Sequence, residues 1–170
     1  NWATISPPPQ MTCNNYNDVL LTANAIYVAA CGNSEVIRST DDGATWSFVL
    51  FGLPSDEIKL LREAGGWIFA ATATELYRSD DQGQHWVPCH NGIGSSQLPI
   101  QDITYHAGRY YLCDNKKVYA SADGENWTDI SQGLPSLPDW RWGGALLVRG
   151  GTLYYGTNIF GVWQRDLSNI

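Results

Sequence analysis

Short apolar segments recur along the chain in sets of three, with turn-forming residues between them. They are rich in the β-branched and aromatic residues that favour strands, and short turns such as Ala64–Gly66 separate the first two members of a set. The segments occupy 19–21, 26–29 and 36–38, then 58–61, 67–70 and 76–78, then 103–105, 110–112 and 118–120, and finally 145–148, 153–155 and 162–164. This pattern predicts an all-β chain in which each set is an antiparallel meander.

An eight-residue motif, Ser-x-Asp-x-Gly-x-x-Trp, follows the third segment of the first two sets, and a copy one residue shorter follows that of the third set. Its residues are Ser39, Asp41, Gly43 and Trp46, then Ser79, Asp81, Gly83 and Trp86, then Ser121, Asp123, Gly124 and Trp127. A further short segment and a glycine follow each copy, which gives each set a fourth strand. We therefore expect a β-propeller of four four-stranded blades.

The fourth set is not followed by a tryptophan of this kind, but the start of the chain resembles the missing piece. Asn1–Ser6 (NWATIS) is similar to Asn126–Ser131 (NWTDIS). Counting nine residues on from Trp163, the spacing found in the first two repeats, reaches Trp2 when the chain is treated as a circle. The N-terminal strand would then complete the last blade and close the ring, which removes exposed sheet edges.

We accordingly expect one domain over residues 1–170, with blades at about 16–54, 57–93, 100–135 and 142–170 plus 1–6. The alternative is that this chain is half of a larger propeller made by two chains.

The motif resembles the Asp-box, or BNR, repeat of sialidases, xyloglucan-active glycosidases, sortilin-type receptors and photosystem assembly factors. The resemblance covers nearly the whole chain, and it implies that the boxes lie on the rim, away from a ligand-binding face near the axis. The residue types suit a structural role. Aspartates accept N–H groups across their own turns, glycines permit positive φ, and tryptophans pack between blades. We expect this role for every box residue, Trp2 included.

Charge and cysteine usage exclude several classes of function. The formal net charge is −7 and the basic residues are scattered, so nucleic acid is not an expected partner. No apolar run approaches the roughly 20 residues of a membrane-spanning helix, which argues against membrane insertion. The four cysteines form no Cys-x-x-Cys pair, and no metal or cofactor is expected. They are interpreted as small buried residues or, in an exported protein, as disulfide partners. The resemblance implies a secreted, periplasmic or cell-surface location, although no signal peptide opens the sequence.

The candidate ligand-binding residues lie on loops that propellers of this kind place at one end of the blades. They are Asp139, Trp140, Arg141 and Trp142 in one loop, with Tyr16, Glu35, Glu75, Asp114 and Asn158 in the others. A tryptophan beside an arginine and an aspartate is typical of a sugar site, because the indole stacks on the ring while the polar groups bond its hydroxyls. The alternative is that the two tryptophans cap the core.

These residues favour a non-catalytic, lectin-like module that binds a glycan or a protein. A second hypothesis is a small glycoside hydrolase using Glu35, Glu75, Asp114 or Asp139, which requires two carboxyl groups about 5–9.5 Å apart. A third is a structural subunit that self-associates into a larger propeller. Sialidase activity is not expected, because the sequence shows no arginine cluster for a substrate carboxylate.

Overall fold

The computed structural model describes residues 15–30, 35–94, 99–135, 144–158, 161–168 and 170. Within these residues the chain forms fifteen strands and no helix. The strands are β1 Tyr16–Leu21, β2 Ile26–Ala30, β3 Val36–Ser39, β4 Ser47–Phe48, β5 Leu60–Ala64, β6 Trp67–Ala71, β7 Leu76–Ser79, β8 Val87–Pro88, β9 Asp102–His106, β10 Arg109–Cys113, β11 Val118–Ser121, β12 Thr128–Asp129, β13 Gly144–Arg149, β14 Thr152–Thr157 and β15 Gly161–Asp166. No helix among the described residues could therefore span a membrane.

The strands form four antiparallel sheets in which neighbours in sequence are neighbours in space. We call the sheets blades 1 to 4: β1–β4, β5–β8, β9–β12 and β13–β15. The repeats keep one register, since Val28 pairs with Val19 and Ile37 just as Ala70 pairs with Leu61 and Tyr77. The predicted all-β architecture of consecutive meanders is confirmed.

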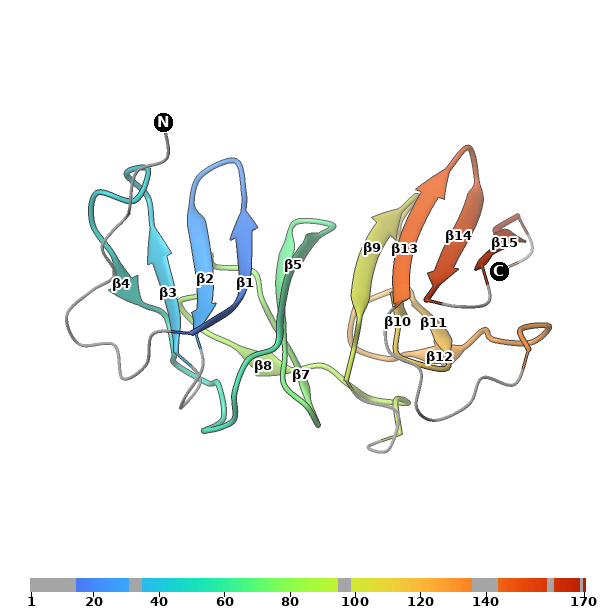
Figure 1. Ribbon diagram of the computed structural model, residues 1–170, viewed down its shortest axis with the longest axis horizontal. Coiled ribbons are helices and arrows are strands. Elements are labelled where there is room, and N and C mark those ends of the chain that lie inside the picture. Colours follow the sequence, from blue (N-terminus) through green and yellow to red (C-terminus); the bar gives the residue numbers. More distant parts are fainter. Residues whose placement is uncertain (1–14, 31–34, 95–98, 136–143, 159–160, 169) are drawn as a thin grey trace.

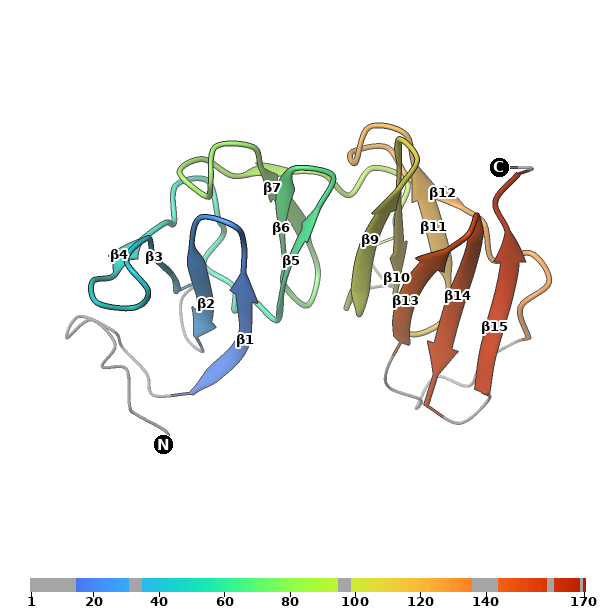
Figure 2. The same cartoon turned by 90° about the horizontal axis from the view of Figure 1, so that it is seen from above.

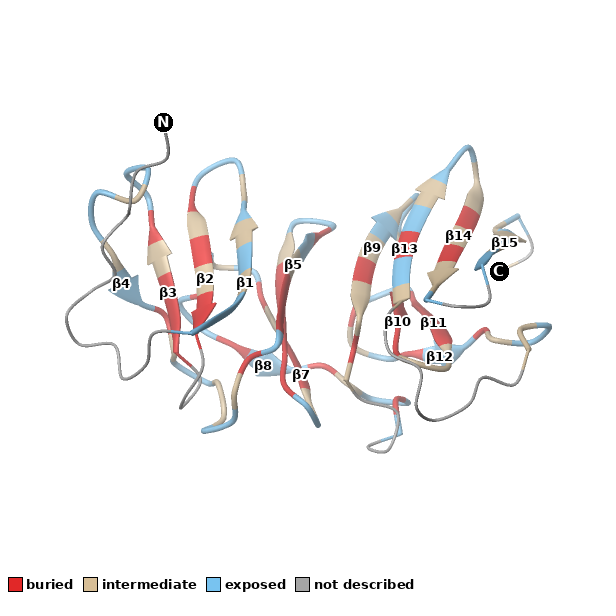
Figure 3. Cartoon of the chain, viewed as in Figure 1, coloured by how far each residue is buried: buried red, intermediate tan, exposed pale blue. Residues whose placement is uncertain are grey.

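The blades stand side by side in an arc, with blade 1 and blade 4 at opposite ends (Figures 1 and 2). Each blade buries apolar side chains against its neighbours, as the buried positions along the central strands show (Figure 3). Separate clusters fill the three interfaces, around Tyr27 and Leu61, around Phe69 and Leu112, and around Tyr111 and Tyr155. Such packing suits strands that are apolar on both faces.

The fourth blade has three strands within the described part of the chain. Asn1–Ser6, predicted to supply its outer strand, lies outside the described residues, so the ring closure stays a prediction. Two cysteines can be placed: Cys89 and Cys113 are buried and free. Burial raises the pKa of both thiols, as befits small core residues.

Candidate functional site

A serine and an aspartate hold each box turn together. In blade 2, Ser79 Oγ donates to Asp81 Oδ1 (2.8 Å) and accepts from Gly83 N (2.8 Å). Asp81 Oδ1 also accepts from His85 N at 2.9 Å. Gly83 has φ of +82°, where a side chain would be strained. The turns that begin at Ser39 and Ser121 contain the same serine–aspartate bond.

These bonds lower the pKa of the box carboxyls. The hydroxyl and the backbone N–H of Thr45 donate to Asp41 at 2.6 and 2.8 Å and lower its pKa to about 2. Burial raises the pKa of Asp81, but bonds from His85 and Ser79 outweigh burial and bring it to about 2. The pKa of Asp123 is also lowered, mainly by bonds from Asn126. Near neutral pH the three carboxylates are therefore ionised acceptors within turns, not proton donors for catalysis.

Two box tryptophans bind the preceding blade. Trp86 is 3% exposed and its indole N–H donates to Val49 O in blade 1 at 3.0 Å. Trp127 is 5% exposed and its indole N–H donates to Cys89 O in blade 2 at 2.7 Å. Trp46 belongs to blade 1 and is only half-buried, and its indole N–H bonds to Gly43 O within its own turn. Among the described residues, a box tryptophan is therefore buried at an interface where another blade precedes its own, as for Trp86 and Trp127.

Arginines on the third strands reinforce the same interfaces from the rim. Arg38 donates to the side chain of Gln82 at 2.8 Å. Arg78 donates to Glu125 at 2.9 Å and its guanidinium lies 4.3 Å from the ring centroid of Trp67. Each arginine therefore reaches from its own blade to the box turn of the next.

A charged relay runs along the first strands of the blades. Asp18 Oδ2 accepts from Leu61 N (2.9 Å) and Arg62 Nη1 (2.8 Å). Arg62 Nε donates to Asp102 Oδ1 (2.9 Å), and Asp102 Oδ2 accepts from Leu146 N (2.9 Å). The two aspartates and the arginine therefore join all four blades through their inner strands.

The antiparallel order places one family of loops at a single end of the blades, where first strands begin, second strands end and third strands begin. We call this end the loop face. Tyr16, Glu35, Glu75, Asp114 and Asn158 all belong to it, but their exposure differs. Tyr16 is 46% exposed and Asn158 is exposed, whereas Glu35 and Asp114 are buried and Glu75 is half-buried.

The buried carboxylates of the loop face serve the fold. Asp114 is fully buried, and its Oδ1 accepts from Lys116 N (2.6 Å) and Lys117 N (2.7 Å), which closes the turn between β10 and β11. Burial raises the pKa of Asp114 despite these bonds. Glu75 accepts a hydrogen bond from the hydroxyl of Tyr77. Asp114 and Glu35 are thus buried at the loop face, and the ligand-binding role expected for these two residues stays a prediction.

The exposed part of the loop face includes a broad hollow between blades 2 and 3. The hollow measures about 560 Å³ and is lined by Lys59, Leu60, Ala73 and residues 99–101. The loop with Asp139, Trp140, Arg141 and Trp142 lies outside the described residues, and its role stays a prediction. Among the described residues, no group of three or more His, Cys, Asp or Glu side chains is placed to hold a metal ion.

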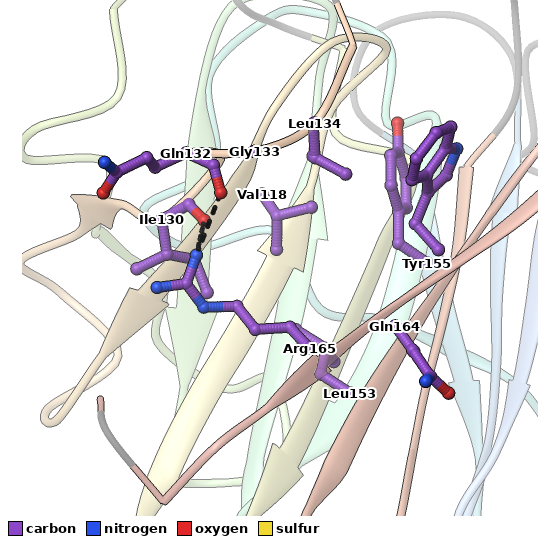
Figure 4. Close-up of a pocket in the computed structure, with 10 residues that line it drawn as sticks. Val118, Ile130, Gln132, Gly133, Leu134, Leu153, Tyr155, Gln164 and Arg165 are labelled. Atoms are coloured by element: carbon purple, nitrogen blue, oxygen red, sulfur yellow. Dashed lines mark hydrogen bonds between the residues drawn. The ribbon is translucent and has the colours of Figure 1, made fainter.

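A second hollow, of about 170 Å³, opens between the outer parts of blades 3 and 4 (Figure 4). Its walls are mainly apolar and include Val118, Leu153 and Tyr155. Arg165 crosses it and donates from Nη1 to Ile130 O at 2.7 Å (Figure 4). This hollow lies at an interface between blades, not on the loop face.

Sequence reasoning did not find the relay of Asp18, Arg62 and Asp102. A signal was present in part, because Asp18 and Asp102 take equivalent places in their repeats. Leu60 stands at that place in blade 2, and Arg62 of the same strand bridges the two aspartates instead. Only the side-by-side packing of the blades brings these residues together.

Comparison with known proteins supports the fold. Residues 64–139 match the model of the DUF6242 beta propeller domain. No curated protein matches the chain by sequence. With its four meander blades, the chain is a β-propeller protein.

Several solved structures share this arrangement. An ancestral GH74 enzyme is 23% identical, with a TM-score of 0.68 over 91% of this chain and 25% of its own. The extracellular domain of a one-component system from B. thetaiotaomicron is 12% identical, with a TM-score of 0.71 over 98% of this chain and 23% of its own. YCF48 bound to D1 peptide is 13% identical, with a TM-score of 0.65 over 98% of this chain and 55% of its own. This chain thus spans a quarter to about half of these structures, and the likeness concerns the fold.

Proposed function

We propose that this protein is a non-catalytic binding module that holds a glycan on its loop face. The observation that favours binding over catalysis is the burial and hydrogen bonding of the loop-face carboxylates. Asp114 is fully buried and closes its own turn, and Glu75 is bonded by Tyr77. Catalysis of glycoside hydrolysis needs two carboxyl groups that reach one sugar ring from opposite sides.

The groups that remain accessible on this face suit binding. Tyr16 offers an exposed aromatic ring, Asn158 offers an exposed amide, and the hollow beside Lys59 offers apolar surface next to a cation. The predicted loop of Trp140, Arg141 and Trp142 would add two indoles and a guanidinium. Aromatic rings with a few polar groups are a common composition for a ligand site.

Tryptophan fluorescence during titration with soluble oligosaccharides tests the proposal. We expect a saturable change that is lost when Trp140→Ala and Trp142→Ala are combined and weakened by Tyr16→Ala. Asn24→Ala is the matched control, because Asn24 is exposed on the hairpin at the opposite end of blade 1. A panel in which no sugar changes the fluorescence would contradict glycan binding.

A protein ligand is the second candidate, and two related folds favour it. YCF48 is seen bound to a peptide, and a chain of a nidogen/laminin complex has a TM-score of 0.58 with this chain. A peptide display screen on the loop-face variants named above tests this candidate. We also propose export, since PorZ, a bacterial surface component with a TM-score of 0.53, shares the fold.

Hydrolysis remains the enzymatic alternative because GH74 enzymes share the fold. Release of reducing ends from xyloglucan and related polysaccharides tests it directly. Activity that disappears in Glu75→Gln but persists in the control Glu63→Gln, an exposed carboxyl at the opposite end of β5, would replace the binding proposal.

A further inference from the structure

The hollow between blades 3 and 4 occupies the place that a box tryptophan fills at the other two interfaces. There, the indole N–H of Trp86 donates to Val49 O and that of Trp127 to Cys89 O. Each acceptor stands three residues after the box tryptophan of its own blade. In blade 3 that residue is Ile130, which lines the hollow (Figure 4).

The acceptor for the backbone of such a tryptophan is also present. Between blades 2 and 3, Asn91 O accepts from the backbone N–H of Trp127 at 2.8 Å. The equivalent carbonyl in blade 3 is that of Gln132. Arg165 Nη1 lies 2.7 Å from Ile130 O and 3.4 Å from Gln132 O (Figure 4). One guanidinium nitrogen therefore occupies both acceptors that the two N–H groups of a tryptophan take elsewhere.

Each interface has an equivalent glycine, and the space around its Cα shows whether the strand of the following blade packs against that glycine. A Cβ on Gly52 would lie 2.2 Å from Trp86 O, and one on Gly92 would lie 2.2 Å from Trp127 O. At the equivalent Gly133, no residue that the structure describes has an atom within 4 Å of that position. The hollow of about 170 Å³ is near the roughly 150 Å³ of an apolar cavity that accepts a benzene ring. Among the described residues, the third interface therefore leaves open both the side-chain space beside Ile130 and the backbone position beside Gly133.

The two end blades expose surfaces that are buried inside the arc. Val19 of blade 1 is 60% exposed, whereas its equivalents Leu61 and Ile103 are buried by the preceding blade. Val162 of blade 4 is 72% exposed, whereas its equivalent Val118 is buried by the following blade. Blade 1 therefore exposes the face that blades 2 and 3 pack against the preceding blade. Blade 4 exposes the face that blade 3 packs against the following blade.

We propose that a second copy of this chain docks on blade 4, with its Asn1–Ser6 segment alongside β15 and its Trp2 indole in the hollow. Trp2 would donate to Ile130 O and displace Arg165. The Val19 face of the incoming blade 1 would then cover Val162. This contact joins blade 4 of one copy to blade 1 of the other. A closed ring of two copies contains the contact twice. This assembly is independent of the ligand on the loop face.

The length of chain after Trp2 favours a second copy over the same molecule. The fourth strand of each of blades 1 to 3 ends two residues after the box tryptophan. About a dozen residues then connect it to the first strand of the following blade, as from Phe48 to Leu60. These connections join adjacent blades only. Thr4 precedes Tyr16 by a similar stretch, so the segment reaches a blade directly beside blade 1. Blade 4 of the same molecule stands at the opposite end of the arc (Figures 1 and 2).

Sedimentation equilibrium over a wide concentration range tests the proposal with three single variants. We expect the wild-type protein to reach the mass of two chains, and Trp2→Ala to remain at the mass of one. Gly133→Ala should also remain at the mass of one, because its Cβ would stand where the carbonyl of the incoming tryptophan lies. Gly108→Ala is the matched control, since Gly108 has a similar φ of +85° and equally open space but lies in the β9–β10 hairpin. It should associate like the wild type.

A second measurement uses the peptide Asn-Trp-Ala-Thr-Ile-Ser as the probe. It should bind Trp2→Ala but not the double variant Trp2→Ala/Gly133→Ala, and the same peptide with alanine for tryptophan should not bind. A wild-type protein that stays at the mass of one chain at every concentration would overturn the proposal. So would association that survives both Trp2→Ala and Gly133→Ala. Either outcome leaves the glycan-binding proposal standing, because the fluorescence titration is read separately.

Discussion

At the scale of single residues, the three described box tryptophans share a motif but differ in what they stabilise. Trp86 and Trp127 are buried and bond carbonyls of the preceding blade, whereas Trp46 bonds its own turn. The box aspartates are alike in all three turns because their partners are local. The motif therefore determines the conformation of its turn, whereas the contribution of its tryptophan to stability depends on whether a blade lies beside it.

Replacing Trp127 with phenylalanine should cost about 2–4 kcal/mol of stability, because it leaves the buried Cys89 carbonyl without a donor and removes packed surface. Trp46→Phe should cost below about 1 kcal/mol, since this indole is half-buried. Urea unfolding followed by circular dichroism measures both. Equal losses for the two variants would contradict the role assigned to the interface.

The box aspartates predict how stability depends on acid. Their folded pKa values lie below the ordinary 3.8, so the stability they contribute is present above that value and is lost as pH falls towards about 2. The triple variant Asp41→Asn, Asp81→Asn and Asp123→Asn should unfold at a lower temperature at pH 7. It should then lose less than the wild type on acidification over that window. Calorimetry at a series of pH values measures this, and parallel curves would contradict it.

At the scale of elements, the first strands are joined by charge as well as by apolar packing. Asp18, Arg62 and Asp102 link β1, β5, β9 and, through the N–H of Leu146, β13. The side chain of Arg62 is 35% exposed, so water weakens these pairs but does not separate them. The relay therefore links the first strands of all four blades to one another.

Arg62→Met should destabilise the protein by about 1–2 kcal/mol, because two half-buried carboxylates lose their shared partner. Lys59→Met is the control, since Lys59 pairs with Glu57 at a more exposed position of the same blade. Its cost should be near zero. Chemical denaturation at low and high salt compares them. The proposed relay would be contradicted if the two substitutions had equal effects.

At the scale of the whole molecule, four blades make an arc whose two end surfaces complement each other. Propeller blades are normally buried on both sides, and closure removes their exposed edges. The neighbouring structures are longer than this chain, which spans about 55% of YCF48. Self-association through blade 4 and Asn1–Ser6 would bury both end surfaces.

Because each copy carries a formal net charge of −7, the two copies repel each other at long range. Salt screens this repulsion, so the dissociation constant of the two-chain assembly should fall as ionic strength rises. Sedimentation at low and high sodium chloride measures the effect. A dissociation constant that rises with salt would instead indicate an interface held by opposite charges.

The sequence by itself determined the order of the strands, the box turns and the spacing of the repeats. These depend on contacts within a few tens of residues, and the repeated Ser-x-Asp-x-Gly-x-x-Trp spacing records them directly. The tertiary structure alone decided which carboxylates are buried, how Arg62 bridges two aspartates, and that the third interface holds Arg165 and a hollow. Those features depend on which blades stand beside each other, and repeats that look equivalent in sequence become different when one has a neighbour and another does not.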